Sequence, residues 1–482
     1  MRTLSLGLCL LLVATPLGAQ QVVLRDHPRV QESLALLTAW ADAKRAYEGI
    51  PGVSMAVVHD QELLWSQGFG LANREGDVAA TPQTIYSICS ISKLFTSIAV
   101  MQLRDAGKLR LDDPLSRHLR WFAIRDTFPD AAPVTIEGVL THASGLPREA
   151  DFPYWSAPDF TFPTREQVID RQRQQTDLYP AWTYSQYSNL GLVLAGEVVA
   201  TVSRRQFEDY VRTRILEPLA MQSTTAEIPV TLHGTRLAVG YSSRLRDGTR
   251  PALPAFQGGG IAPAMAFAST VEDMARFASW QFRVLHHGAK EVLDKNTLRE
   301  MHRVHWVDPS WETTWGLGFQ VTRVADKTVV GHGGSCPGYR SHITLDPEAK
   351  LASIFMSNAG GVDAELFARR AIEIVGVAVE EALDPEKQPR TTHPALALYV
   401  GTYDDAPWGG EVVVLPWKGR LAAVDLPTND PMHALVELRQ TSTHTFRRVR
   451  KDKKLGEEVR FEVGADGRVT RMWWHSNYST RR

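Results

Sequence analysis

Apolar residues near the start of the chain follow first a helical and then a strand-like pattern. Between about Val30 and Tyr47 they recur at helical spacing, which predicts an amphipathic helix with a buried face formed by Leu34, Leu37, Trp40 and Ala43. Pro51-Gly52 ends this pattern. The apolar runs Val53–Val58 and Leu63–Trp65 flank a polar turn at Asp60-Gln61, which predicts a β-hairpin of a buried sheet.

The middle of the chain is predicted to be mainly helical. From Ser90 to about Ala106 the sequence is helical in period and apolar on most sides, which is typical of a central, buried helix. Further helices are predicted over Thr135–Thr141, over Leu190–Thr201 and, after a capping-box start at Ser269–Asp273, through Trp280. Trp155–Arg173 is rich in proline, aromatic and charged residues, so we expect an irregular surface excursion there.

Strand patterns return after residue 310. Strands are predicted at Trp315–Phe319, Thr328–Gly334, Ser341–Leu345 and Leu351–Met356, followed by a closing helix over Phe367–Glu381. The order of these elements indicates an α+β domain over residues 28–383, whose antiparallel sheet takes strands from both ends of the domain.

The last part of the chain has a different pattern. Residues 384–394 are polar and carry prolines, which is typical of a linker. Residues 395–482 show only short strand patterns, which predicts a small all-β domain of barrel or sandwich type; its strands are expected at Tyr399–Tyr403, Val412–Val414, Leu421–Val424, Phe461–Val463 and Val469–Trp474. The basic run Arg447–Lys454 is interpreted as a solvated face, with a binding patch as the alternative.

Residues 1–19 have the sequence pattern of a cleaved secretory signal. A short basic start precedes the apolar run Leu4–Ala14, and small residues follow at Pro16–Ala19. A retained anchor is the alternative. We therefore expect export to the bacterial periplasm or the medium, where a disulfide between the remaining cysteines, Cys89 and Cys336, can persist.

Charge and composition exclude several classes of function. The 482 residues carry a formal net charge of −1, so nothing indicates nucleic acid or an anionic membrane surface as a partner. No internal stretch is long and apolar enough to span a bilayer in the mature chain. The scattered histidines show no grouping with acidic residues or cysteines, so no metal and no cofactor is expected.

Ser90 and Lys93 are the first candidates for chemistry. They lie one helical turn apart and would share one face of the predicted helix. A serine becomes nucleophilic when a nearby base takes its proton, and a lysine can act as that base when its pKa is depressed by burial among apolar neighbours. Ser-x-x-Lys alone is a weak motif, because chains of this length contain it by chance.

Three motifs in order make the indication specific. Ser90-Ile91-Ser92-Lys93, Tyr187-Ser188-Asn189 and His332-Gly333-Gly334 together resemble the Ser-x-x-Lys, Tyr-x-Asn and Lys-Thr-Gly set of the serine β-lactamase and penicillin-binding-protein-like hydrolases. The resemblance is to the branch of class C β-lactamases, DD-carboxypeptidases, D-aminopeptidases and esterases, and it covers roughly residues 30 to 380. The C-terminal segment, from Tyr399, resembles the lipocalin-like barrel appended to such hydrolases.

This resemblance implies a role for each motif residue. Ser90 would be acylated, Lys93 would accept or relay its proton, and Tyr187, as a phenolate or in a short hydrogen bond with Lys93, would be the general base. Asn189 would bind the substrate's amide and steady Lys93, and the strand residues His332, Gly333 and Gly334 would line the substrate. The backbone amides of Ser90 and Ser335 would form the oxyanion hole. Tyr184 is a rival for the tyrosine role, but it lacks the following asparagine pattern.

His332 is the departure from the β-lactamase and carboxypeptidase pattern, which has lysine at this position. Histidine is mostly neutral near pH 7 and does not hold a substrate carboxylate as a lysine does. D-aminopeptidase-like and esterase-like members often carry histidine here, so efficient penicillin turnover is less expected. The alternative is a strand histidine that only bonds its neighbours.

Cys89 and Cys336 adjoin two of the motifs. Some class A carbapenem-hydrolysing enzymes resemble this arrangement and have a disulfide between the same two places, so the resemblance implies a Cys89–Cys336 disulfide. A pair of buried free thiols is the alternative.

These observations predict an exported serine acyl hydrolase that works through a Ser90 acyl-enzyme. A small peptide or amide, possibly with D-residues, is the first expected substrate, an ester the second, and a β-lactam or DD-carboxypeptidase substrate the third. The rival from another class is a catalytically silent protein that binds cell-wall fragments. The oligomeric state does not follow from the sequence.

Overall fold

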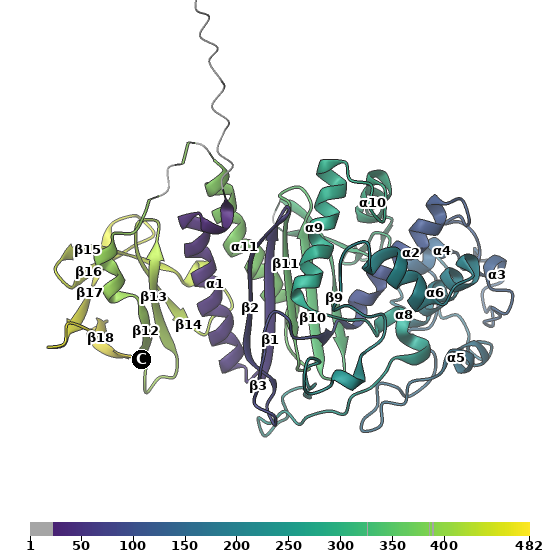
Figure 1. Cartoon of the computed structure of the whole chain (residues 1–482), viewed down its shortest axis with the longest axis horizontal. Coiled ribbons are helices and arrows are strands. Elements are labelled where there is room, and N and C mark those ends of the chain that lie inside the picture. Colours follow the sequence, from purple (N-terminus) through teal and green to yellow (C-terminus); the bar gives the residue numbers. More distant parts are fainter. Residues whose placement is uncertain (1–22, 325, 385, 388–389) are drawn as a thin grey trace, which may run out of the picture.

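The computed structural model of the chain describes residues 23–324, 326–384, 386–387 and 390–482. The predicted signal peptide, residues 1–19, lies outside these residues. Four layers follow one another in Figure 1: a β-barrel, a pair of helices, a large sheet and a helical region. The expected α+β fold with a following all-β barrel is therefore confirmed.

The sheet brings together strands from both ends of the first domain. Within the described residues it has nine antiparallel strands, in the order β3 (Val78–Ala79), β2 (Glu62–Asn73), β1 (Gly52–His59), β11 (Leu351–Ser357), β10 (Tyr339–Asp346), β9 (Lys327–Cys336), β8 (Gln320–Val324), β7 (Thr314–Trp315) and β6 (Trp306–Val307). Val53 of β1 lies opposite both Phe69 and Ser357. Because β1 and β11 are central and buried, both read in the sequence as continuous apolar runs.

Helices cover both faces of the sheet. α1 (Pro28–Tyr47) and α11 (Ala364–Leu383) lie on the face toward the barrel, and α9 (Val271–His287) lies on the other face (Figure 1). Each helix begins where the sequence supplies a cap: Pro28 occupies the first turn of α1, and the side chains of Thr270 and Asp363 accept amide hydrogen bonds at the starts of α9 and α11.

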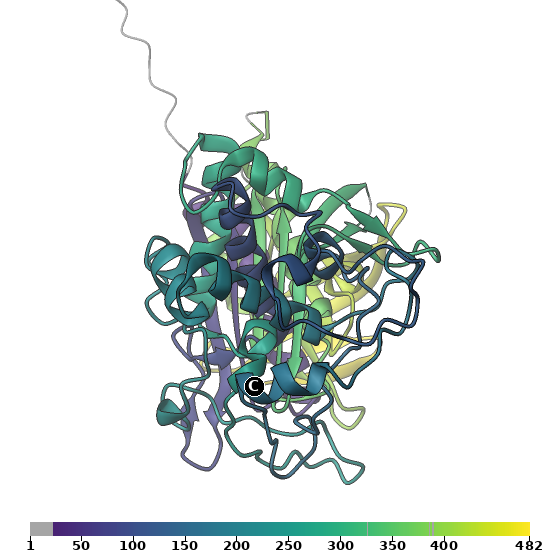
Figure 2. The same ribbon diagram turned by 90° about the vertical axis from the view of Figure 1, so that its right-hand side faces the viewer.

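The helical region faces the viewer in Figure 2 and surrounds the buried helix α2 (Ser92–Asp105), which packs against α6 (Asn189–Ser203) and α8 (Ala262–Met265). The remaining helices are short: α3 (Leu115–His118), α4 (Ile136–Leu140), α5 (Arg165–Gln172), α7 (Phe207–Val211) and α10 (Lys295–His302). Single turns occur at η1 (Leu24–Asp26), η2 (Cys89–Ile91), η3 (Arg212–Leu216), η4 (Val230–Leu232) and η5 (Gly259–Ile261), and a two-stranded ribbon forms from β4 (Tyr86–Ser87) and β5 (Ala268–Ser269).

Three local predictions were wrong. The excursion Trp155–Arg173 contains α5, which begins with a capping box in which Thr164 and Gln167 each bond the other's backbone amide. Gly316–Phe319 does not extend a strand but connects β7 to β8, since Gly318 turns the chain with φ +83°. Tyr399 ends the helical turn η6 (Pro394–Tyr399), so the first barrel strand begins two residues later.

Residues 401–481, all described, form a closed eight-stranded barrel. Its strands are β12 (Gly401–Asp404), β13 (Glu411–Trp417), β14 (Arg420–Leu426), β15 (Val436–Ser442), β16 (Thr445–Val449), β17 (Leu455–Val463), β18 (Val469–Trp474) and β19 (Asn477–Arg481), with α12 (Pro431–Ala434) between β14 and β15. Residues 450–454 of the basic run form an exposed turn after β16.

Two barrel strands are buried on both faces. Val412 and Val414 of β13 point into the barrel, whereas Val413, Leu415 and Trp417 share a core with α1 and α11. Trp40 of α1 is fully buried in this shared core, packs against Phe367 with ring centroids 5.1 Å apart, and donates its indole N–H to the Thr428 carbonyl at 2.8 Å. The barrel is therefore fixed to the helical layer by apolar contact and by a directed hydrogen bond.

Trp40→Ala is expected to destabilise the protein by about 3–5 kcal/mol, because it removes a large buried side chain and leaves the Thr428 carbonyl without its donor. The measurement is the free energy of unfolding in urea. Trp311→Ala is the matched control: Trp311 is 81% exposed, so a change within about 0.5 kcal/mol is expected. Equal effects of the two substitutions would contradict the role of Trp40.

Candidate active site

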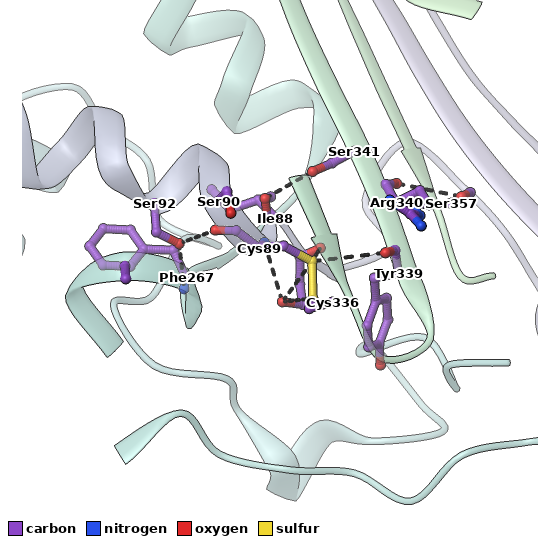
Figure 3. Close-up of a disulfide and its surroundings, with 12 residues drawn as sticks. Ile88, Cys89, Ser90, Ser92, Phe267, Cys336, Tyr339, Arg340, Ser341 and Ser357 are labelled. Carbon is purple, nitrogen blue, oxygen red and sulfur yellow. Dashed lines mark hydrogen bonds between the residues drawn. A yellow bond between two sulfur atoms is a disulfide. The ribbon is translucent and has the colours of Figure 1, made fainter. Parts of the chain in front are cut away.

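The backbone around Ser90 is fixed from both sides. Ser90 lies in the single turn η2, which leads directly into α2. Figure 3 shows the Ser92 hydroxyl bonded to the Cys89 carbonyl at 2.5 Å and to the Phe267 amide at 3.0 Å, and the Ser341 hydroxyl donating to the Ile88 carbonyl at 2.8 Å. These bonds place the Ser90 hydroxyl at the N-terminal end of a buried helix.

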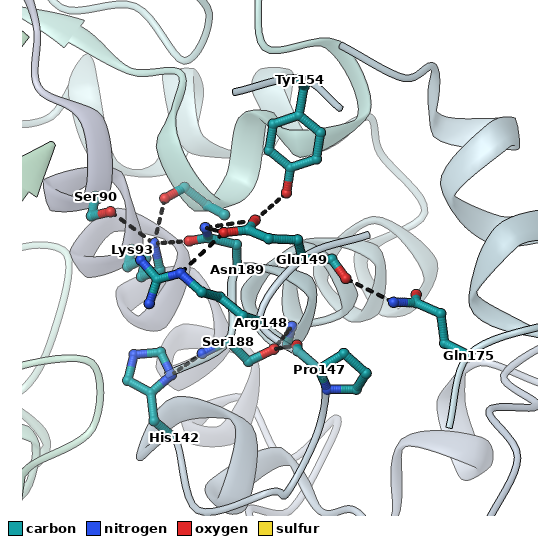
Figure 4. Close-up of polar contacts among 12 residues, drawn as sticks. Ser90, Lys93, His142, Pro147, Arg148, Glu149, Tyr154, Gln175, Ser188 and Asn189 are labelled. Atoms are coloured by element: carbon teal, nitrogen blue, oxygen red, sulfur yellow. Dashed lines mark hydrogen bonds and ion pairs between the residues drawn. The ribbon is translucent and has the colours of Figure 1, made fainter. Parts of the chain in front are cut away.

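Lys93 is buried directly behind Ser90. Its Nζ lies 3.1 Å from Ser90 Oγ, 2.8 Å from Asn189 Oδ1 and 2.8 Å from the Ala264 carbonyl (Figure 4). Burial lowers the pKa of Lys93 well below its usual range, and the charge of Glu149 opposes this shift without cancelling it. A neutral amine has two N–H groups, which suit the two carbonyl oxygens, so its lone pair is left for the Ser90 hydroxyl.

Glu149 sets the orientation of Asn189. The Asn189 amide nitrogen donates to both Glu149 carboxylate oxygens, at 3.0 and 2.9 Å, so the amide oxygen must face Lys93. Tyr154 also donates its hydroxyl to Glu149, and Arg148 Nε lies 3.2 Å from the same carboxylate. Figure 4 shows this chain of contacts running from Tyr154 to Ser90.

Tyr187 is held by aromatic rings. Its ring centroid lies 4.2 Å from that of His142 and 6.0 Å from that of Trp315, and Lys93 Nζ lies 4.8 Å from it. Burial raises the pKa of Tyr187 and its interaction with Ser90 opposes this only in part, so the phenol is neutral at neutral pH. Because Lys93 directs its bonds to other acceptors, the structure favours a neutral Tyr187 over the phenolate. Tyr184 is 52% exposed and packs against Tyr179 instead.

His332 is a neutral histidine in the cavity wall. Its Nδ1 lies 2.6 Å from the Gly333 carbonyl, which can only accept, so Nδ1 carries the proton. Nε2 is buried and finds no partner among the described residues. Burial lowers the pKa of His332 to about 3. The imidazole therefore provides a neutral acceptor here, where a lysine would provide a fixed positive charge.

The end of β9 passes close to the turn that carries Ser90 and has an open edge. A Cβ at Gly334 would lie 2.3 Å from the Ile88 carbonyl, so only glycine fits there. β8 pairs with β9 only as far as Gly331. Cys336 and Tyr339 flank the two-residue turn that leads to β10. The backbone of only every second residue of β9 therefore hydrogen-bonds to β10. The backbone amide of Ser335 is not one of these, so it faces the open edge.

A cavity of about 690 Å³ joins these groups. It is lined by Ser90, Tyr187, Asn189, His332, Gly333, Gly334 and Ser335, together with residues that the sequence did not single out. Lys93 lies behind this wall. The first turn of α11 borders the other side of the cavity with Asp363 and Glu365, and the lining residues in the described chain all come from the first domain.

The sequence comparison decides the family. The profile of the Beta-lactamase family matches residues 37–376, which is more than half of the chain. The chain belongs to the Beta-lactamase family. A second profile, of a domain of unknown function (DUF3471), matches residues 385–481. The chain is accordingly a serine hydrolase with an appended barrel.

The chain is similar to several proteins that are named for different activities. Beta-lactamase-like protein 2 of Dictyostelium discoideum is 27% identical over 351 residues, 70% of this chain, but the match spans only 61% of that protein. Penicillin-binding protein 4 of Amycolatopsis lactamdurans is 26% identical over 79% of this chain and 98% of its own length. D-aminopeptidase of Gluconobacter oxydans is 28% identical over 77% of this chain and 66% of its own length.

Solved structures have the same fold. The octameric penicillin-binding protein homologue from Pyrococcus abyssi superposes with a TM-score of 0.63 at 23% identity, covering 93% of this chain and all of its own.

Among the described residues, no helix is long and apolar enough to cross a membrane, and no group of three His, Cys, Asp or Glu side chains is placed to hold a metal ion.

Sequence reasoning missed three parts of this Beta-lactamase-family site. Glu149 belongs to none of the three motifs, so no signal in the sequence pointed to it. Arg340 lines the cavity but lies outside the three motifs. The Ala264 carbonyl, a backbone acceptor for Lys93, has no side-chain signature at all.

A disulfide ties the two halves of the site together. Cys89, adjacent to Ser90, is joined to Cys336, adjacent to Ser335, with their Cα atoms 5.6 Å apart (Figure 3). The bond closes a sequence separation of 247 residues and connects the turn that carries Ser90 directly to β9. It therefore limits how far Ser90 and the Ser335 amide can move apart.

The Cys89→Ala/Cys336→Ala variant is expected to lose about 2–4 kcal/mol of stability and to react more slowly with acylating probes, because the Ser90–Ser335 spacing is no longer held. The measurements are thermal unfolding and the rate of Ser90 acylation. Wild type treated with dithiothreitol should behave like the variant, and the variant itself should not respond to dithiothreitol. Unchanged stability and rate would contradict the proposed constraint.

Proposed function

We propose that the protein is an exported serine acyl hydrolase that cleaves small amides or peptides, including those with D-residues, through an acyl-enzyme on Ser90. The observation that carries this proposal is the Lys93 amine, 3.1 Å from Ser90 Oγ and bound by two carbonyl acceptors. Because burial lowers the pKa of that amine, it can take the Ser90 proton at a pH well below the range of an ordinary lysine.

The proton can be followed through the proposed reaction. Ser90 Oγ attacks the substrate carbonyl as its proton moves to Lys93 Nζ, and the backbone amides of Ser90 and Ser335 stabilise the oxyanion. Neutral Tyr187 donates a proton to the leaving nitrogen or oxygen, and the Lys93 ammonium replaces it. Water then attacks the acyl-enzyme by the same route in reverse, which restores the Ser90 hydroxyl.

The preference for amides and peptides over β-lactams rests on His332 and on a relative. The neutral imidazole of His332 gives no fixed charge for a penicillin carboxylate at the place where a lysine would stand. The D-aminopeptidase of Gluconobacter oxydans supports an amide or peptide substrate. Ester hydrolysis uses the same groups. Turnover of β-lactams or DD-carboxypeptidase substrates is the second candidate, favoured by the likeness to a penicillin-binding protein.

Export is supported by two separate features. The N-terminal residues 1–19 have the pattern of a secretory signal. The Cys89–Cys336 disulfide persists in an oxidising compartment such as the periplasm.

The first test is labelling of the mature protein with a fluorophosphonate probe and, in parallel, with a fluorescent penicillin. Fluorophosphonate labelling that disappears in Ser90→Ala is expected. Stable penicillin labelling as well would favour the carboxypeptidase-like candidate. Absence of both labels would overturn the proposal in favour of a silent binding protein.

The pH profile tests the role of Lys93. Because its pKa is lowered by burial, the acylation rate should rise with pH along a limb well below the 10.5 of an ordinary lysine, and Lys93→Arg should be inactive at every pH. The measurement is kcat/KM, or the rate of fluorophosphonate labelling, from pH 5 to 10. A limb near pH 10 would contradict a neutral Lys93.

A further inference from the structure

Four connections between strands lie together at one end of the barrel. The eight strands pair in chain order and each pair is antiparallel, so successive connections alternate between the two ends of the barrel. The connections that follow β12, β14, β16 and β18 therefore share one end. We call it the basic end, and it consists of residues 405–410, 427–435, 450–454 and 475–476.

The turn between β16 and β17 concentrates positive charge at the basic end. Residues 447–454 include six basic residues and one acidic residue, an excess that the net charge of −1 for the whole chain conceals. Lys451, Lys453 and Lys454 are all exposed. Among the described residues, no carboxylate lies within ion-pair distance of these three amines. The turn therefore presents uncompensated positive charge to its surroundings.

The acidic residues nearest to this turn do not neutralise its lysines. Asp452 lies 3.1 Å from the Arg450 guanidinium, and Glu457 lies 3.2 Å from that of Arg448. Glu458 is exposed on β17 and faces β16. Each of the two ion pairs compensates one arginine, so the lysines of the turn remain as the surplus charge.

A groove of about 570 Å³ lies beside the basic turn. It is bounded by the start of β15, the end of β16 and the start of β17, which lie on the side of the barrel away from α1 (Figure 1). Arg447 and Lys451 line it together with the half-buried aliphatic side chains of Val436, Val449 and Leu455. A wall that is both cationic and aliphatic suits an amphipathic anion better than a purely polar one.

An exposed tryptophan stands at the same end of the barrel. Trp408 lies in the connection between β12 and β13, and it is 82% exposed. Tryptophan favours the boundary between water and the hydrocarbon of a bilayer, because its ring is apolar and its N–H is polar. A cluster of lysines together with an exposed tryptophan is a combination that suits contact with an anionic membrane surface.

The basic end and the active-site cavity lie at the same end of the molecule. The Thr428 carbonyl of the basic end accepts the hydrogen bond of Trp40, in the second half of α1, and α1 leads directly into β1. The first residues of β1 lie level with the last of β11, the first of β10 and the last of β9, which include Ser335 of the cavity wall. A surface bound by the basic end would therefore lie at the cavity's end of the molecule.

We propose that the basic end of the barrel binds the surface of an anionic lipid bilayer. Lys451, Lys453 and Lys454 lie against the lipid phosphates, and Trp408 enters the boundary between the headgroups and the acyl chains. A lipid surface is favoured over a soluble polyanion because the groove wall and Trp408 add apolar surface to the charge. The inference concerns the barrel and does not depend on the reaction proposed for Ser90.

The test is sedimentation of the mature chain with lipid vesicles. Vesicles of equal parts phosphatidylcholine and phosphatidylglycerol should bind the protein, and vesicles of phosphatidylcholine alone should not. Sodium chloride at about 0.5 M should release the protein, because salt screens the attraction. The variant Lys451→Gln/Lys453→Gln/Lys454→Gln should bind about 100-fold more weakly, since each lysine near an anionic surface contributes to binding. Trp408→Ala should also weaken binding.

Each variant has a matched control in the first domain. Lys108→Gln/Lys290→Gln/Arg323→Gln removes the same number of positive charges from exposed positions, and it should bind vesicles as wild type does. Trp311→Ala is the control for Trp408→Ala, because Trp311 is 81% exposed but lies outside the barrel. All of these residues are on the surface, so every variant should unfold at the temperature of the wild type.

Several results would overturn the inference. They are equal binding to both kinds of vesicle, binding to neither, unchanged binding of the variant without the three lysines, and an equal loss of binding in its matched control. Binding to soluble polyphosphate but not to vesicles would overturn it in favour of a polymeric ligand. Fluorophosphonate labelling of Ser90 requires no lipid, so failure of this inference and failure of the proposed function are distinguishable.

Discussion

Burial of one lysine amine is the constraint around which the site is built. A charged ammonium in the interior is disfavoured, so burial lowers the pKa of Lys93, and its N–H groups need acceptors. Asn189 and the Ala264 carbonyl, on α6 and α8, meet this need. The packing of α2 against these two helices therefore also positions the amine that serves as the base for Ser90 under the proposed function.

Much of this arrangement could be predicted from the sequence. The three motifs could be recognised in the sequence because each is local and adjoins a helix or strand with a clear period. In the structure, Ser90, the Tyr187–Asn189 pair and the β9 glycines line one cavity. The expected α+β fold followed for the same reason: β1 and β11 are apolar on both faces and had to be central strands.

The sequence did not predict what depends on distant contacts. The protonation state of Tyr187 depends mainly on its burial, which raises its pKa and which distant segments create, so the choice between a phenolate and a phenol bonded to Lys93 had no local signature. Arg340 looks like an ordinary strand arginine in the sequence, and its place in the cavity wall is visible only in three dimensions. By contrast, α5 had a readable capping box at Thr164 and Gln167, which the proline-rich surroundings obscured.

The position of α11 gives the barrel a mechanical connection to the cavity that it does not line. This helix is joined to the barrel by polar contacts, an ion pair of Glu381 with Lys418 at 2.7 Å and a hydrogen bond from Arg370 to the Asn429 carbonyl at 2.7 Å. Its first turn forms the cavity border at Asp363 and Glu365. A helix of 20 residues is a nearly rigid rod about 30 Å long. A movement of the barrel that shifts α11 along with it would therefore also move Asp363 and Glu365 at the border of the cavity.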